Sequence, residues 1–273
     1  MRPLDLTFAR APDGRTYLAR QHVAWPFHVT RTFAYQGDPD GMATVVLQSV
    51  GAGLVEGDRI AVAVRCDGGA CAHVTTQGAT IGHAMTARDA RLDLALVLEP
   101  GAWLEWLPDP MILFAGATVA VTTSVTLAPD ATLLLADGFL GHDPAARARP
   151  FNRLTSLLEL RAPDGRLIAF DRFALDGAAF ADGLPGANGA FGAVATLVVA
   201  SGAHAAAALR DPLAEALDGV VGAYAGVSVL PGDVGVVIRV LATDGAALRA
   251  ASACAWRAAR ERLAGRAPAP RRK

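Results

Sequence analysis

The chain of 273 residues is 52% hydrophobic and 19% charged, which fits a globular protein with a sizeable core and excludes intrinsic disorder. Its formal net charge of −1 gives no electrostatic reason to expect nucleic acid or a membrane as a partner. Three cysteines without framework spacing fit a reducing compartment. The start at Met1 lacks the apolar core of a signal peptide, and the Ala-rich residues 193–209 are too polar to span a membrane. We therefore expect a cytoplasmic protein.

The first elements in chain order are strands joined by tight turns. Residues 10–15 read Arg-Ala-Pro-Asp-Gly-Arg, and the same hexapeptide returns at residues 161–166. Because Pro-Asp-Gly favours a turn, each copy predicts a strand–turn–strand unit. Between the copies, residues 23–33 and 42–50 are predicted strands, and the second is apolar enough to be buried on both faces.

Residues 51–80 form the stretch around which the rest of the chain is organised. Ile60, Val62 and Val64 alternate with smaller or polar residues, which predicts a strand with one buried face. Residues 67–69, Asp-Gly-Gly, then predict a tight hairpin turn. The returning strand ends in the polar residues 75–77, Thr-Thr-Gln. They are either solvated strand polarity or groups held for a partner or a buried water path.

Similar turns recur further along the chain. Aligned on the alanine that follows each turn, the units lie at Ala70, Ala102 and Ala131, a period of roughly thirty residues made only of strands. Since isolated hairpins are marginally stable, this period predicts stacked β-hairpin layers, a mainly β, superhelix-like fold.

The C-terminal half adds loops and helices to this pattern. Residues 137–152 and 177–192 are predicted loops, and Asp211 is the predicted N-cap of a short helix over 212–217. Residues 246–263 form the one long predicted helix, with an Ala-rich stripe toward the sheet. Its arginines Arg249, Arg257 and Arg260 are expected on the opposite side. We predict one domain over residues 1–265 and a basic, disordered tail over 266–273.

Four motifs in order resemble the UreD (UreH) family of urease accessory proteins. They are Gly-Leu-Val-Glu-Gly-Asp-Arg at 53–59, Thr-Thr-Gln-Gly-Ala-Thr at 75–80, Leu-Glu-Trp-Leu-Pro at 104–108, and Ile-Leu-Phe at 112–114 followed by Gly-Ala. The likeness continues through Asp171-Arg172 to the Ala-rich helix and Gly-Arg-Ala-Pro at 265–268. It covers most of the chain.

The resemblance implies a non-enzymatic scaffold of β-superhelical fold. In that family it lies between apo-urease and the partner proteins UreF and UreG, the latter a nickel-carrying GTPase. No permanently bound cofactor is implied, although nickel could be contacted transiently. Departures from the family pattern at Ile81, Ala84 and His142, where Lys and Arg are common, identify a divergent member.

Few residues suggest chemistry of their own. His73 and His83 flank the Thr-Thr-Gln cluster and are the weak candidates for a transient nickel contact, since imidazole suits nickel; structural histidines are the alternative. Alternation along the strand predicts a half-exposed carboxylate at Glu105. We expect Thr75 to be satisfied internally and Gln77 to have a wetted, functional role. The candidate partner or passage residues are Asp58, Thr75, Thr76, Gln77, Thr80, Glu105 and His142.

Two functions from different classes fit these observations. The first is an assembly chaperone for urease, as the order of the motifs implies. The second is a β-helical carbohydrate-active enzyme, in which paired carboxylates would act as acid and base. Aspartate and glutamate occupy mostly turns and not the repeated strands, which favours the chaperone.

Overall fold

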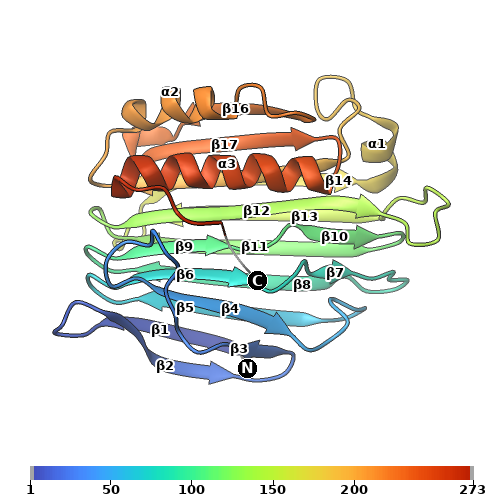
Figure 1. Ribbon diagram of the computed structural model, residues 1–273. Coiled ribbons are helices and arrows are strands. Elements are labelled where there is room, and N and C mark those ends of the chain that lie inside the picture. The colour runs from blue at the N-terminus through green and yellow to red at the C-terminus, as the bar shows by residue number, and fades with distance from the viewer. Residues whose placement is uncertain (1–2, 271–273) are drawn as a thin grey trace.

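The computed structural model describes residues 3–270, which form two stacked β-sheets (Figure 1). Sheet A has the strand order β14-β13-β11-β8-β5-β1-β2, and sheet B has the order β16-β17-β15-β12-β9-β6-β4-β3 with β10 and β7 attached. The strands of sheet A are β1 (Leu4–Arg10), β2 (Thr16–Val23), β5 (Arg59–Cys66), β8 (Ala90–Leu98), β11 (Thr118–Leu127), β13 (Arg153–Arg161) and β14 (Leu167–Asp176). Those of sheet B are β3 (Phe27–Val29), β4 (Ala43–Ser49), β6 (Cys71–Thr76), β7 (Ile81–Gly82), β9 (Trp103–Leu107), β10 (Met111–Phe114), β12 (Thr132–His142), β15 (Ala193–Ser201), β16 (Ala223–Val229) and β17 (Gly235–Ala242). The helices are α1 (Gly177–Asp182), α2 (Ala206–Leu217) and α3 (Gly245–Ala264), with a 3-10 turn at Pro231–Asp233.

From β4 to β13 the chain passes back and forth between the two sheets, so it winds as a β-solenoid. The predicted stacked layers are confirmed, but the hairpin at Asp67–Gly69 is wrong. β5 pairs with β1 and β8, and β6 pairs with β4 and β9, so the turn carries the chain from one sheet to the other. The aligned alanines stack the layers: Ala70 O accepts from Trp103 N at 2.8 Å, and Ala102 O accepts from Thr132 N at 2.8 Å.

The repeated hexapeptide does form two hairpins, as predicted. One copy joins β1 to β2 and the other joins β13 to β14, both antiparallel. The same two hydrogen bonds close each turn, Ala11 N to Arg15 O with Gly14 N to Ala11 O, and their equivalents from Ala162 and Gly165. These hairpins therefore bracket the parallel strands of sheet A at both edges.

Two hydrophobic cores hold the layers together. The first lies between the sheets and is built from alternate residues of the strands, such as Leu6, Val62, Leu96 and Leu133. The second lies between helices α2 and α3 and the β15–β17 end of sheet B, whose outer face they cover (Figure 1). This end of sheet B is thus covered on both faces, which explains the nearly continuous apolar runs of β15 and β17.

Three segments differ from the prediction for identifiable reasons. β12 continues to His142 because it pairs with β15 as far as Leu140, so the predicted loop 137–152 begins only after it. The predicted loop 177–192 contains α1, which Asp176 caps through Ala179 N at 3.0 Å. The short helix begins at Ala206 and not beside Asp211, because Leu209 and Leu213 extend its buried stripe toward the N-terminus.

The predicted long helix is confirmed as α3. Asp244 caps its start by accepting from Ala246 N and Ala247 N at 2.8 and 2.9 Å. Gly265 ends it in the left-handed region, at φ 68°. Arg260, which we expected on the exposed side, is fully buried. Among residues 3–270, no helix is both long and apolar enough to cross a membrane.

Beyond α3 the chain lies along the 36–40 loop. Ala269 N donates to Gln36 O at 3.1 Å, and Arg266 reaches the Asp38 carbonyl and the Asp40 carboxylate. These contacts involve residues 266–270 of the predicted disordered tail; its last three residues, 271–273, lie outside the described residues.

Candidate functional site: a window in sheet B and a buried ionic cluster

Sheet B is interrupted where β9 passes into β10. Residues 108–110 read Pro-Asp-Pro, and proline cannot donate to a strand ladder. β12 pairs with β9 up to Leu135 and with β10 from Phe139 onward, so Ala136, Asp137 and Gly138 have no ladder partner on that side. One layer away β6 ends at Thr76 and β7 starts at Ile81, which continues the break (Figure 1). We call this break the window.

The window connects two hollows. An interior cavity of about 110 Å³ lies between the sheets, and an outer groove of about 880 Å³ lies between sheet B and α3. The same residues line both hollows: Pro108, Asp109, Ala136, Asp137 and Gly138. Polar groups of the window therefore face the inside of the solenoid as well as its outer surface.

Asp137 is the acidic group at the centre of the window. Its carboxylate accepts a long hydrogen bond from Ser156 Oγ on sheet A, at 3.4 Å, so the side chain points between the sheets. It remains exposed to the cavity despite the surrounding protein. Desolvation by the surrounding protein, with a contribution from the charge of Asp171, raises the pKa of Asp137 above its usual value of 3.8.

The Thr-Thr-Gln cluster lies at the edge of this window. Thr75 is fully buried and donates to Leu107 O at 2.7 Å, so its hydroxyl is satisfied internally. Thr76 Oγ1 accepts from Asp109 N at 2.9 Å and fixes the Pro-Asp-Pro turn. Thr76 and Thr80 line the interior cavity, and the exposed Gln77 lines the outer groove.

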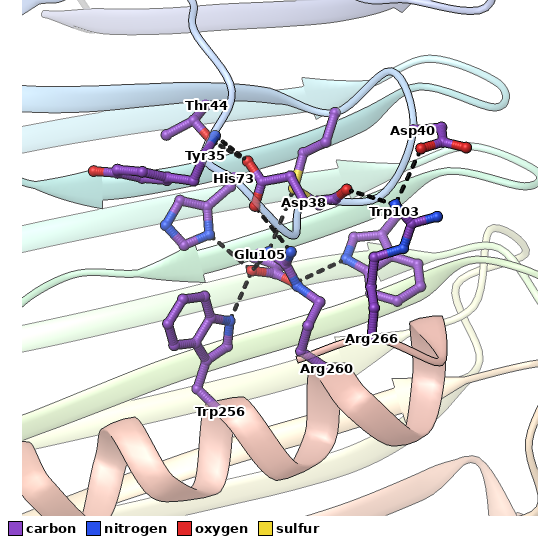
Figure 2. A network of polar contacts seen from close by, with 11 residues as sticks. Tyr35, Asp38, Asp40, Thr44, His73, Trp103, Glu105, Trp256, Arg260 and Arg266 are labelled. Atoms are coloured by element: carbon purple, nitrogen blue, oxygen red, sulfur yellow. Dashed lines mark hydrogen bonds and ion pairs between the residues drawn. The ribbon is translucent and has the colours of Figure 1, made fainter. Parts of the chain in front are cut away.

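Glu105 belongs to a different arrangement, on the α3 side of sheet B (Figure 2). The predicted half-exposed carboxylate is wrong: Glu105 is fully buried, because α3 covers the face of β9 from which it projects. Its carboxylate makes five contacts with donors. They are His73 Nδ1 at 2.7 Å, Trp103 Nε1 at 3.1 Å, Trp256 Nε1 at 2.9 Å, and Arg260 Nε and Nη2 at 2.5 and 2.6 Å.

These donors determine the ionisation of Glu105. Burial alone would raise its pKa, but the hydrogen bonds and charges of His73 and Arg260 outweigh burial and hold the pKa at about 2. Glu105 is therefore a carboxylate at every physiological pH. Because protein donors occupy its acceptor positions, the Glu105 carboxylate holds neighbouring segments together and is not available to a ligand.

Arg260 extends the cluster to a third segment of the chain (Figure 2). Its Nη1 donates to Asp38 Oδ1 at 3.0 Å, and the other oxygen of Asp38 accepts from Tyr35 N at 2.7 Å. The guanidinium also lies 5.5 Å from the ring centre of Trp256. The ionic cluster of Asp38, His73, Glu105 and Arg260 thus joins the 35–42 loop, sheet B and α3.

The remaining predicted residues lie apart from both features. Asp58 closes a turn by accepting from Val55 N at 2.8 Å. His83 Nε2 lies 2.7 Å from Ala52 O, and the exposed His142 packs against Phe114. His73 and His83 thus have different neighbours. Among the described residues, no group of three or more His, Cys, Asp or Glu side chains could hold a metal ion.

Two residues central to these features were missed from the sequence. Asp137 follows Leu133 and Leu135 at the strand period and precedes Phe139, so the alternation itself marked it as facing the core. Arg260 lies four residues after Trp256 and next to the buried Ala259, within the width of an apolar helix face. In both cases the sequence signal that could have predicted a buried or core-facing charge was a charged residue on an otherwise apolar face.

The fold and these features define a class: a β-solenoid protein whose buried charges join its segments and whose sheet carries a polar window. Comparison with known proteins identifies the family within that class. The family model described as UreD urease accessory protein matches residues 3–273. The chain belongs to this family, whose members are non-enzymatic.

Individual relatives support the assignment along the whole chain. It is 39% identical over 272 residues to urease accessory protein UreD 1 of Pseudomonas syringae pv. syringae, covering 100% of this chain and 95% of the relative. It is 41% identical over 260 residues to UreD 1 of Bradyrhizobium sp. strain BTAi1, covering 95% and 91%. UreD of Natronomonas pharaonis is 36% identical over 262 residues, covering 96% and 87%. The alternative of a carbohydrate-active enzyme is therefore wrong.

Proposed function

We propose that this protein is a scaffold that holds apo-urease beside UreF-like and UreG-like accessory proteins while nickel is inserted into the urease active site. Membership of the UreD family carries this proposal. The β-solenoid supports it, because rigid stacked layers keep separate surfaces at fixed positions while several partners are bound. We place this activity in the cytoplasm, where urease is assembled.

We further propose that the window is the route by which water and nickel cross sheet B. Nickel is cargo here and is not retained. The window combines carboxylate, hydroxyl and amide oxygens from Asp137, Thr76, Thr80 and Gln77 along the interior cavity and outer groove. Such oxygens replace part of the hydration shell of a divalent ion without forming a closed ligand set, which suits transfer better than storage.

Deletion and complementation test the scaffold. A host lacking this chain, with no second copy, should make normal amounts of urease protein with little nickel and little activity. Full activity and full nickel content in such a host would refute the proposal.

The window is tested in complexes assembled from purified proteins. Asp137→Asn should leave assembly intact and slow nickel transfer to apo-urease severalfold, because it removes the negative charge of the window. Asp130→Asn is the matched control, since Asp130 is exposed in a turn outside the window. Equal transfer by both variants would exclude the window as the route and leave the scaffold proposal standing.

A further inference from the structure

The outer groove has the form of a peptide-binding surface. Its floor is the outer face of sheet B, and one wall is α3. Most of the side chains that line the floor are apolar. The polar groups of the window, Asp109 and Asp137, also line it. The apolar lining residues include Leu107, Ile112, Leu140, Leu197 and Val240.

The α3 wall carries positive charge that no acidic side chain within residues 3–270 pairs with. Arg249 and Arg257 both line the groove and are exposed. Neither makes a salt bridge with any residue of the range 3–270, whereas Arg260 on the same helix binds Asp38 and Glu105. Ser252, Ala253 and Trp256 lie between the two arginines in the groove lining, so one face of α3 is presented along its length.

The position of this wall is fixed by the ionic cluster. Trp256 Nε1 and the Arg260 guanidinium are both bound by Glu105, which is part of β9. Together with the buried Leu248, Ala251 and Ala255, these contacts hold α3 between Arg249 and Arg257 against the sheet. Eight residues of helix separate the two arginines by about 12 Å along the axis. A binding surface with fixed charges costs little ordering when a ligand arrives.

We propose that the outer groove binds an acidic amphipathic segment of a protein partner in the urease assembly complex, an inference that rests on the proposed function. Apolar side chains of the segment lie on the floor, and two of its carboxylates pair with Arg249 and Arg257. Asp137, with its negative charge at the window, repels acidic groups there, so the segment binds with its carboxylates toward α3. A partner docked in this way lies directly over the window.

Charge reversal tests this surface in the full-length chain. Arg249→Glu combined with Arg257→Glu should weaken binding of one purified partner (the UreF-like protein, the UreG-like protein or apo-urease) by at least about tenfold at low salt. Arg20→Glu combined with Arg31→Glu is the matched control, because both residues are exposed and lie outside the groove. Reversing two acidic residues in the affected partner should restore binding to the reversed variant.

Each outcome is decisive. If the reversed variant binds all three partners as the parent does, at low and high salt, the groove proposal is overturned, and the scaffold proposal stands. If the parent itself binds none of the three, the scaffold proposal fails first. If the reversal instead abolishes self-association of the chain, measured by light scattering, a second copy occupies the groove and the proposal of an acidic partner segment is overturned.

Discussion

Glu105 and Asp137 are two carboxylates of the same sheet, and the protein treats them in opposite ways. Glu105 accepts from four side chains, and the resulting pKa is about 2. Asp137 is desolvated by the surrounding protein and has only the Gly138 backbone and a long bond from Ser156 as donors, so its pKa is raised. Burial raises the pKa of both groups, and only Glu105 has enough donors to outweigh it.

The difference also separates two uses of a carboxylate within the sheet. The Glu105 cluster fastens α3 and the 35–42 loop to sheet B, so its charges are consumed by internal contacts. Asp137 keeps most of its hydrogen-bonding capacity for whatever enters the window. Variants of the first group should therefore affect folding, and variants of the second should affect nickel transfer.

Removing Arg260 should produce the largest effect. Arg260→Ala leaves the carboxylates of Glu105 and Asp38 buried without their shared cation, which we expect to cost about 3–5 kcal/mol of unfolding free energy. Denaturant unfolding measures this loss. Arg262→Ala is the matched control, since Arg262 is an exposed arginine of the same helix, and it should change stability by less than about 0.5 kcal/mol. Similar losses for the two variants would show that the cluster does not fasten α3.

Acid should weaken the fold through Glu105. The pKa of Glu105 is about 2 in the folded protein and 4.5 in the unfolded chain. As the pH falls, the unfolded chain therefore takes up the proton first. The stabilisation is complete above pH 4.5 and is lost between pH 4.5 and 2, an expected loss of about 3 kcal/mol. Unfolding free energies measured across this range should fall less steeply for Glu105→Gln. Parallel pH profiles of parent and variant would contradict the assignment.

Asp137 should respond in the opposite direction. Its raised pKa means that the ionised form is disfavoured in the folded protein, a cost that appears as the pH rises above 3.8. At neutral pH Asp137→Asn removes this cost, so the melting temperature should equal or exceed that of the parent while nickel transfer falls. A clear drop in the melting temperature would place Asp137 among the residues that hold the fold together.

The sequence predicted local patterns well, but it predicted less well which strands pair and which elements pack against each other. Alternation and the alanines at positions 70, 102 and 131 predicted the stacked layers, because strand period and turn chemistry are local. The same patterns could not distinguish a hairpin from a turn between sheets at Asp67–Gly69. That distinction depends on which strands pair, and the pairing is between residues far apart in the chain.

The buried charges show the same limit. Glu105 was predicted half-exposed because strand alternation says which face a residue is on, but not that a helix residue 151 positions later, Trp256, covers that face. The internal hydrogen bond of the Thr75 hydroxyl was predicted correctly, since a hydroxyl at the end of a buried strand has backbone acceptors in the next layer. The window arises from strand breaks in adjacent layers, and only their register in space makes them one opening.

The smallest effect on stability is expected at Gln77. Its side chain is exposed in the outer groove, and the side-chain amide makes no hydrogen bond to any of residues 3–270. Gln77→Leu removes an amide without burying an unsatisfied group, so the melting temperature should remain nearly unchanged. If Gln77 hydrates the cargo or the docked segment, urease activation by the variant should nevertheless fall severalfold. Gln21→Leu is the matched control, being an exposed glutamine of β2 outside the groove. A Gln77→Leu protein that folds normally and activates urease as well as the control would remove Gln77 from the functional residues and confine the passage to Asp137 and the threonines.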